Sequence, residues 1–254
     1  MNRTGLAAEL RRFWNVLQRH RFAMLLVSLA ALFAATALVF TFEAYGNRLL
    51  AGIVVACLFD LVLLSAVNVV CDTRRTMAVA ISFAVPAIVC NLLHVITRST
   101  VVAVTSNLLS LCFISIVVVL VLAFLLRHEQ IDANMICASL CVYLMIGMIW
   151  SLLFSLCAVL HPDSFVYAYT DLLERPEMAF GAESSLNPIY YSFVTLTTLG
   201  YGDIVPFSPP AKMLAVLEAI VGQIYLTVLV ARLVGLHIAH GSSGSRPKNS
   251  DAQD

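Results

Sequence analysis

The residues whose types and spacing best suit chemistry form the heptapeptide TTLGYGD, residues 197–203 of a chain of 254 residues. Gly200 and Gly202 can take backbone angles that are closed to residues with a Cβ atom, so the carbonyl groups of this segment can turn toward one axis. If several copies surround that axis, rings of carbonyl oxygens, with the hydroxyl of Thr198 below them, replace the hydration shell of a monovalent cation. The heptapeptide therefore predicts a site for a dehydrated cation.

A short helix is expected to lead into this heptapeptide. Asn187 and Pro188 are typical of a helix cap followed by proline at the first helical position, which predicts a helix over 188–197. Such a helix would be about 15 Å long, too short to cross a hydrocarbon core of about 30 Å. Non-helical backbone at membrane depth is tolerated only where protein or water satisfies its polar groups. The two segments therefore predict a re-entrant loop, in which the negative end of the helix dipole favours a cation.

The composition places these segments in a membrane protein. Hydrophobic residues make up 61% of the chain and charged residues only 12%, where roughly 25% is usual for globular domains. The formal net charge of zero gives no indication of a nucleic-acid partner. The seven cysteines lie in or at the ends of apolar runs and are interpreted as buried hydrophobes. We therefore expect an all-α integral membrane fold.

Six stretches are long and apolar enough to cross a bilayer as helices. They are 22–41, 49–71, 77–97, 101–126, 132–160 and 210–239. With six spans both termini lie on one side, and eleven of the fifteen basic residues fall on that side: Arg3, Arg11, Arg12, Arg19, Arg21, Arg74, Arg75, Arg127, Arg232, Arg246 and Lys248. The positive-inside rule therefore predicts cytoplasmic termini. The basic segment 1–21 is interpreted either as an interfacial helix or as a topogenic tail.

The heptapeptide and its surroundings resemble the selectivity filter of the potassium channel family, with Leu199 where valine is common. The resemblance covers 131–239 and implies a pore domain made of an outer helix, a turret at 161–186, a pore helix at 188–197, a filter at 198–202 and an inner helix at 210–239. It also implies a homotetramer around a fourfold axis, with no cofactor besides K⁺. The filter residues would be Thr198, Leu199, Gly200, Tyr201 and Gly202, of which the first four offer carbonyl oxygens to K⁺.

The same resemblance implies residues that support the filter. Tyr201 would pack on aromatic residues of the pore helix, for which Tyr190 and Tyr191 are the candidates, and Asp203 would add negative charge at the outer mouth. In many members of the family this aspartate pairs with an acidic residue of the pore helix, but Val194 stands at that position here. Such a pair is therefore not expected in this chain.

The inner helix contributes two further candidates. Gly222 resembles the gating hinge of potassium channels, although close packing between helices would also explain a glycine here. Glu218 is a costly carboxylate at membrane depth and is expected to act behind the filter. The hydroxyls of Thr195 and Thr197 are its candidate partners, and Thr197 is also counted among the residues that support the filter.

The first four spans, 22–127, resemble the layout of a voltage-sensor bundle, but 101–126 contains no Lys or Arg. Without charges to move through the field, this helix cannot be a conventional voltage sensor. Asp60 and His94 are the intramembrane ionisable residues of the bundle, and Asp60 calls for a partner. The candidates are Asn91, His94 and Asn107. This group forms either a structural hydrogen-bond network or a proton or ion sensor.

The sequence as a whole predicts a potassium-selective channel that carries passive K⁺ flux across a plasma membrane, of the bacterial inner-membrane kind. Its expected partners are the lipid bilayer, K⁺ and three further copies of the chain, and the sequence specifies neither a gating stimulus nor an accessory subunit. A nonselective cation channel and the pore subunit of a potassium transporter are the alternatives. An enzyme is not expected, because no cluster of ionisable residues lies at one depth. The polar tail 240–254 is expected to be disordered and cytoplasmic.

Overall fold

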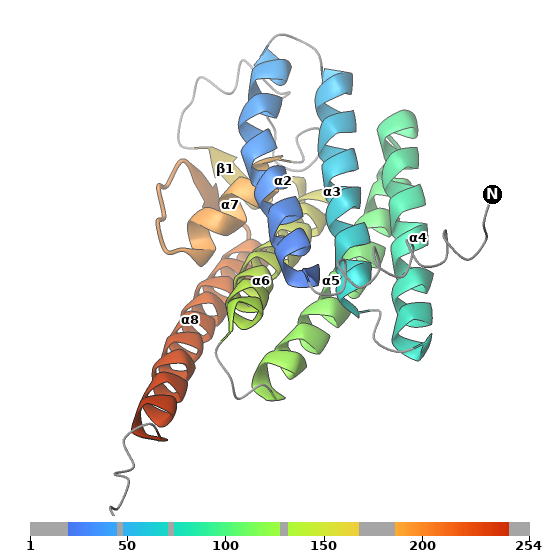
Figure 1. The fold of residues 1–254 in the computed structure, drawn as a ribbon. Helices are drawn as coiled ribbons and strands as arrows, with labels where there is room; N and C mark the ends of the chain where they lie inside the picture. The colour runs from blue at the N-terminus through green and yellow to red at the C-terminus, as the bar shows by residue number, and fades with distance from the viewer. Residues whose placement is uncertain (1–19, 45–47, 71–73, 128–131, 168–185, 244–254) are drawn as a thin grey trace, which may run out of the picture.

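The computed structural model describes residues 20–44, 48–70, 74–127, 132–167 and 186–243, and long helices dominate them (Figure 1). The helices are α2 (Arg21–Ala44), α3 (Arg48–Val70), α4 (Arg74–Thr97), α5 (Thr100–Arg127), α6 (Ala133–Leu160), α7 (Leu186–Leu196) and α8 (Pro209–Ser243). Between them lie a short 3-10 turn, η1 (Pro162–Ser164), and two strands, β1 (Phe165–Tyr167) and β2 (Ile204–Pro206). The expected N-terminal segment lies outside the described residues except at its end, where Arg21 already begins α2.

Five of the described helices, α3, α4, α5, α6 and α8, are long and apolar enough to cross a membrane. In α2 the described side chains give a shorter apolar stretch, Arg21–Ala35. These findings confirm an all-α, multi-pass membrane protein, and the sixth span stays a prediction.

The helices α2 to α5 form a bundle in which each packs on the next along the chain. In Figure 1, α2, α3 and α4 run side by side, with α5 and α6 behind them. One core of buried residues extends from α2 across α5 to α6, and its largest fully buried side chains include Phe113, Leu25 and Met145. The bundle and α6 therefore share one hydrophobic interior.

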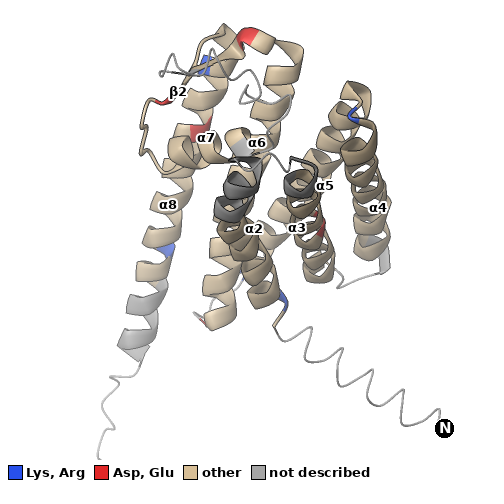
Figure 2. Cartoon of the chain, turned by 90° about the horizontal axis from the view of Figure 1, so that it is seen from above, with Lys and Arg blue, Asp and Glu red and all other residues tan. Residues whose placement is uncertain are grey.

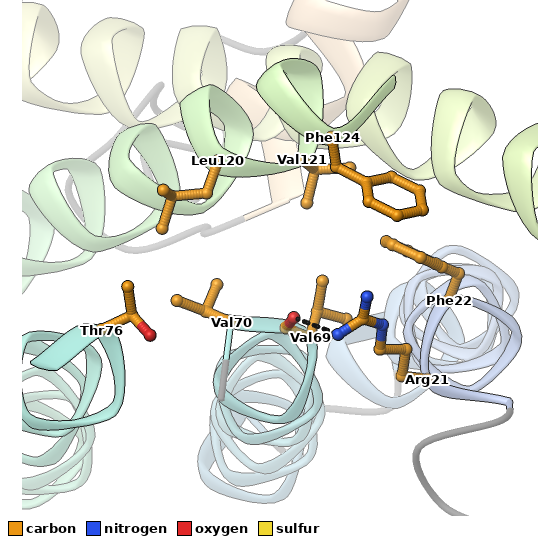
Figure 3. Close-up of a pocket in the computed structure, with 8 residues that line it drawn as sticks. All are labelled: Arg21, Phe22, Val69, Val70, Thr76, Leu120, Val121 and Phe124. Atoms are coloured by element: carbon orange, nitrogen blue, oxygen red, sulfur yellow. Dashed lines mark hydrogen bonds between the residues drawn. The ribbon is translucent and has the colours of Figure 1, made fainter. Parts of the chain in front are cut away.

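Arg21 joins three helices at one end of this bundle (Figure 3). Its guanidinium donates a 3.4 Å hydrogen bond to the Val69 carbonyl near the end of α3. It also lies over the rings of Phe22 and Phe124, at 5.1 and 5.6 Å from their centroids. A cation is favoured both at a helix C-terminus and over an aromatic face. This arginine of the positive-inside set therefore also has a structural role.

The second half of the chain packs α7 on both α6 and α8. The α6 helix begins where the sequence predicted, because the Asp132 side chain caps it by accepting the Met135 N–H at 2.8 Å. The α7 helix begins at Leu186, so Asn187 is not the residue that precedes it and the predicted cap position is wrong. The first N–H groups of a helix need no intrahelical partner, so Pro188 fits inside the first turn as well as at its start.

Two other boundaries also differ from the prediction. The expected turret starts with η1 and β1, and β1 pairs antiparallel with β2, with Val166 opposite Val205; its remaining residues, 168–185, are not described. The α8 helix runs to Ser243, so residues 240–243 are helical rather than part of a disordered tail. Extending a formed helix needs no new nucleus, so it can run past its apolar segment. Residues 244–254 lie outside the described part.

Charged residues are sparse along the described helices (Figure 2), and two acidic side chains are buried, Asp60 in α3 and Glu218 in α8. Asn91 of α4 donates a hydrogen bond to Oδ1 of Asp60 at 2.9 Å. Asn91 is one of the three partners that were predicted for Asp60. The other two candidates are not hydrogen-bonded to Asp60. Asn107 donates instead to the Ser155 hydroxyl of α6 at 3.1 Å, and the buried Nδ1 of His94 has no hydrogen-bond partner among the described residues.

The Asp60 contact leads to a first prediction. Asn91→Leu should leave Asp60 buried without its donor and lower the free energy of unfolding by about 1 to 3 kcal/mol. Asp60→Asn, which keeps a side chain able to hydrogen-bond, should cost less. Thermal unfolding of the purified protein in lipid measures both. Equal stability of Asn91→Leu and the wild type would contradict a structural role for the pair.

Candidate functional site

In the heptapeptide, every second residue from Thr198 on has a positive φ angle. After α7 ends at Leu196, φ is positive at Thr198 (61°), Gly200 (56°) and Gly202 (76°). The two glycines take this region without steric cost, whereas Thr198 is strained by its Cβ atom. No heavy atom lies within 4 Å of where a Cβ would stand at Gly200 or Gly202. Conformation, rather than space, therefore requires glycine at these two positions.

The N–H groups of this segment turn back toward the end of α7. Leu199 and Gly200 both donate to the carbonyl of Val194, at 2.9 and 3.3 Å, and Thr198 donates to the carbonyl of Thr195 at 3.0 Å. These bonds satisfy carbonyls that the last helical turn leaves without partners. Within the described part of the chain, no hydrogen bond reaches the carbonyl oxygens of 198–202. The N–H groups of Thr198, Leu199 and Gly200 thus bond to the end of α7, whereas the carbonyl oxygens of 198–202 accept no hydrogen bond from the described residues.

The side chains of the segment are exposed in the single chain, where Leu199 is 59% and Tyr201 67% exposed. Tyr201 is therefore not buried against α7 of its own chain. The predicted packing of Tyr191 on Tyr201 is corrected by the structure, because Tyr191 is buried and its ring meets Phe154 and Phe165 edge to face, with centroids 4.9 and 5.2 Å away. The phenol of Tyr191 thus belongs to the core between α6 and β1.

Tyr190 holds the carboxylate that follows the glycines. Its hydroxyl donates to Oδ2 of Asp203 at 2.6 Å, and the N–H of Ile204 donates to Oδ1 at 3.0 Å. Burial, and next the hydrogen bond to Asp203, raise the pKa of Tyr190 to about 12, so the phenol remains a donor at neutral pH. Val194 has no carboxyl group to pair with Asp203, and Tyr190 anchors Asp203 instead. From the sequence, Tyr190 was a candidate to pack against Tyr201, and its hydrogen bond to Asp203 was not predicted.

A buried serine ties the chain beyond Asp203 to the end of α6. The carbonyl of Ser164 accepts the N–H of Phe207 at 2.7 Å, and the hydroxyls of Ser164 and Ser208 are 3.0 Å apart. Ser164 is completely buried. Together with the pairing of β1 and β2, these bonds fix the outer end of the heptapeptide.

Glu218 contacts α7, but its partner there differs from both threonine candidates. Its predicted role behind the filter stays a prediction. Its side chain is completely buried, and Oε1 lies 2.5 Å from the hydroxyl of Ser192. The same hydroxyl lies 2.7 Å from the carbonyl oxygen of Gly147 in α6. Ser192 precedes Thr195 by three residues and shares its helix face, which is the signal that could have identified it.

Glycines in α6 and α8 let both helices approach α7 closely. A Cβ at Gly222 would lie 2.8 Å from the carbonyl oxygen of Leu196, and one at Gly147 would lie 2.4 Å from the ring of Phe193. The α8 helix is continuous through Gly222. Gly222 therefore has a packing role, and its role as a gating hinge stays a prediction.

The chain matches one protein family and two curated proteins. Residues 135–237, from α6 to α8, match the ion channel family. A two-pore potassium channel 4 of Arabidopsis thaliana is 39% identical over 56 residues, and a voltage-gated potassium channel of Aeropyrum pernix is 32% identical over 59 residues. Residues 135–237 are thus similar to an ion channel domain, and the two relatives are both named as potassium channels.

The two alignments cover 21% and 23% of this chain and 20% of each relative. The chain therefore spans about a fifth of the length of the curated relatives it matches. No solved structure matches the chain.

Tyr190 provides a test of how the chain holds the heptapeptide in place. Tyr190→Phe removes only the hydroxyl that binds Asp203 and should lower the free energy of unfolding by about 1.5 to 3 kcal/mol, as expected for a bond to a charged group. Tyr201→Phe removes the same atom at a position where the described residues provide no hydrogen-bond partner, and it should change stability little. Chemical unfolding of the reconstituted protein compares them, and an equal effect would refute the anchoring role of Tyr190.

A second test uses two glycines of the same helix. Gly222→Ala places a methyl group against the Leu196 carbonyl and should destabilise the protein by about 1 to 3 kcal/mol. Gly235→Ala meets no atom within 4 Å and should stabilise α8 by up to about 1 kcal/mol. Melting temperatures measured in the same lipid give the sign of each change. If both substitutions were stabilising, the close approach of α8 to α7 would be wrong.

Proposed function

We propose that this protein is a potassium-selective channel. In this proposal, four copies place residues 198–202 around a fourfold axis, and the carbonyls of Thr198, Leu199, Gly200 and Tyr201, with the Thr198 hydroxyl, coordinate dehydrated K⁺. The observation that carries it is the row of carbonyl acceptors that no donor among the described residues reaches, which follows directly on the C-terminal end of a short helix. That helix end is negative and favours a cation.

The exposure of α8 supports assembly into a tetramer. Only 11% of its apolar segment is buried within the chain, against 56% for α6. Two polar side chains, Gln223 and Thr227, are exposed one turn apart on this helix. Polar groups within a membrane are unfavourable against lipid and usually face a bundle or a water-filled path. We infer that this side of α8 faces the other copies and the conduction path.

The proposed placement in the membrane follows from the apolar helices and the basic residues. With α2 as the first span there are six, both termini are cytoplasmic, and the loop from α7 to β2 enters from the outer side. The membrane is a plasma membrane, of the bacterial inner-membrane kind. K⁺ is the permeating ion, and neither another cofactor nor an enzymatic activity is proposed.

Voltage gating is not part of the proposal, although the relative from Aeropyrum pernix is named for it. The α5 helix corresponds to the position of the charged helix in a voltage-sensor layout. It contains one basic residue, Arg127, at its last position. The membrane potential therefore has no row of charges on α5 on which to act.

Reconstitution into a planar bilayer tests the function, with K⁺ on one side and Na⁺ on the other. The reversal potential should lie near the equilibrium potential of K⁺. A value near zero would indicate a nonselective cation channel, and saturable uptake coupled to a counter-ion would indicate a transporter subunit. Either outcome would contradict the proposal.

The same measurement applies to two alanine variants. Gly200→Ala should abolish selective current, because alanine at a φ of 56° is strained by about 1 to 2 kcal/mol and the carbonyl row would shift. Gly52→Ala in α3 meets no heavy atom within 4 Å and should conduct as the wild type does. Selective current in Gly200→Ala at the wild-type level would argue against coordination by this backbone.

A further inference from the structure

The hydroxyl of Ser192 lies between two oxygen atoms that belong to different helices. Glu218 Oε1 of α8 is 2.5 Å away, and the Gly147 carbonyl oxygen of α6 is 2.7 Å away. A serine hydroxyl has one proton and can donate it to one acceptor. The other contact needs a second proton, because two oxygens at this distance without a proton between them repel each other. The carbonyl has no proton to give, so the second proton must come from the carboxyl group.

The surroundings of Glu218 favour the same protonation state. Its side chain is completely buried, and Oε2 has no hydrogen-bond partner. Within the described residues, no cation pairs with it. The titratable side chains that interact with it electrostatically are the phenols of Tyr143 on α6 and Tyr191 on α7, which are ordinarily uncharged at neutral pH.

An ionised carboxylate in this position would be a buried charge without a countercharge among the described residues, which is strongly unfavourable. A neutral acid leaves only one carbonyl oxygen, Oε2, without a donor, and under-satisfied carbonyl oxygens are the better tolerated of buried polar groups.

We propose that Glu218 is a protonated, neutral acid that donates to the Ser192 hydroxyl, which in turn donates to the Gly147 carbonyl. This chain of two hydrogen bonds links α8 to α7 and α7 to α6. Glu218 is thereby a positioning residue, because it acts on the heptapeptide through α7. The inference goes beyond ion conduction and holds whether or not the protein conducts.

The position of this chain of bonds gives it a specific effect. Glu218 and Gly222 are four residues apart and share one face of α8, and Gly222 meets Leu196, the last residue of α7. Apolar packing alone fixes the distance between helices, whereas a hydrogen bond between them also fixes their rotation and register. The neutral acid thus sets the rotation of α8 against the helix that leads into residues 197–203.

Infrared difference spectroscopy of the protein in lipid at neutral pH tests the inference without any current measurement. A protonated carboxyl group has a carbonyl stretch above the amide bands, well separated from the carboxylate bands. Glu218→Gln should remove one such acid band, and Ser192→Ala should shift that band to higher frequency because its hydrogen-bond acceptor is lost. Asp132→Asn is the control, because it removes an exposed carboxyl group and should leave the acid region unchanged.

Two results would overturn the proposal. If Glu218→Gln changed only the carboxylate bands, Glu218 would be ionised. If the acid band disappeared in Glu218→Gln but did not move in Ser192→Ala, the acid would be neutral without donating to Ser192. Because Glu218→Gln is nearly isosteric and its amide can still donate to Ser192, this variant is expected to keep the fold even if Ser192→Ala does not, and circular dichroism checks this.

Discussion

A backbone carbonyl in apolar surroundings must find a partner, and this requirement governs the second half of the chain. The segment after α7 directs its N–H groups onto the carbonyls of Val194 and Thr195. Its own carbonyls at 198–202 find no donor among the described residues. In a protein whose helices cross a membrane, such a row is stable only against water, an ion or other protein. The remaining features of this half of the chain hold this unusual backbone in place.

The support comes from three directions. Behind the segment, α7 packs between Gly147 of α6 and Gly222 of α8. The rings of Phe193 in α7 and Phe33 meet edge to face, with their centroids 4.5 Å apart. Beyond it, the bond of Tyr190 to Asp203 and the buried Ser164 fix the outward strand. Because Phe33 belongs to α2, the helix bundle also contacts the short helix directly. The bundle of α2 to α5 is thereby connected to the heptapeptide through side-chain packing. This connection does not depend on a helix that carries a row of charges.

Much of the fold could be predicted from the sequence because long apolar runs and length requirements leave few choices. The helix boundaries from α3 to α6 follow the apolar stretches closely, and the buried carboxylate of Asp60 has its partner among the three residues expected. The glycines at 200 and 202 do take positive φ. Each of these inferences depends on local sequence or on the cost of burying one polar group.

Contacts between elements were harder to predict, because uniformly apolar helices carry no periodic pattern that fixes their rotation. The partner of Glu218 was expected at Thr195 or Thr197 and is Ser192. Tyr191 was expected to pack against Tyr201, but its ring packs against Phe154 of α6 in the core. The strands β1 and β2 have three residues each, which is too few for an alternating pattern to be recognised. These details depend on tertiary geometry that no single segment encodes.

The central claim is that main-chain oxygens of 198–201 from four chains surround K⁺. An electron cryo-microscopy structure of the protein in lipid nanodiscs with K⁺ tests this most directly. The account predicts fourfold symmetry, with this segment on the axis and ion density between the rings of carbonyl oxygens. A monomer or dimer, or a segment that lies on the outer surface away from any symmetry axis, would contradict it.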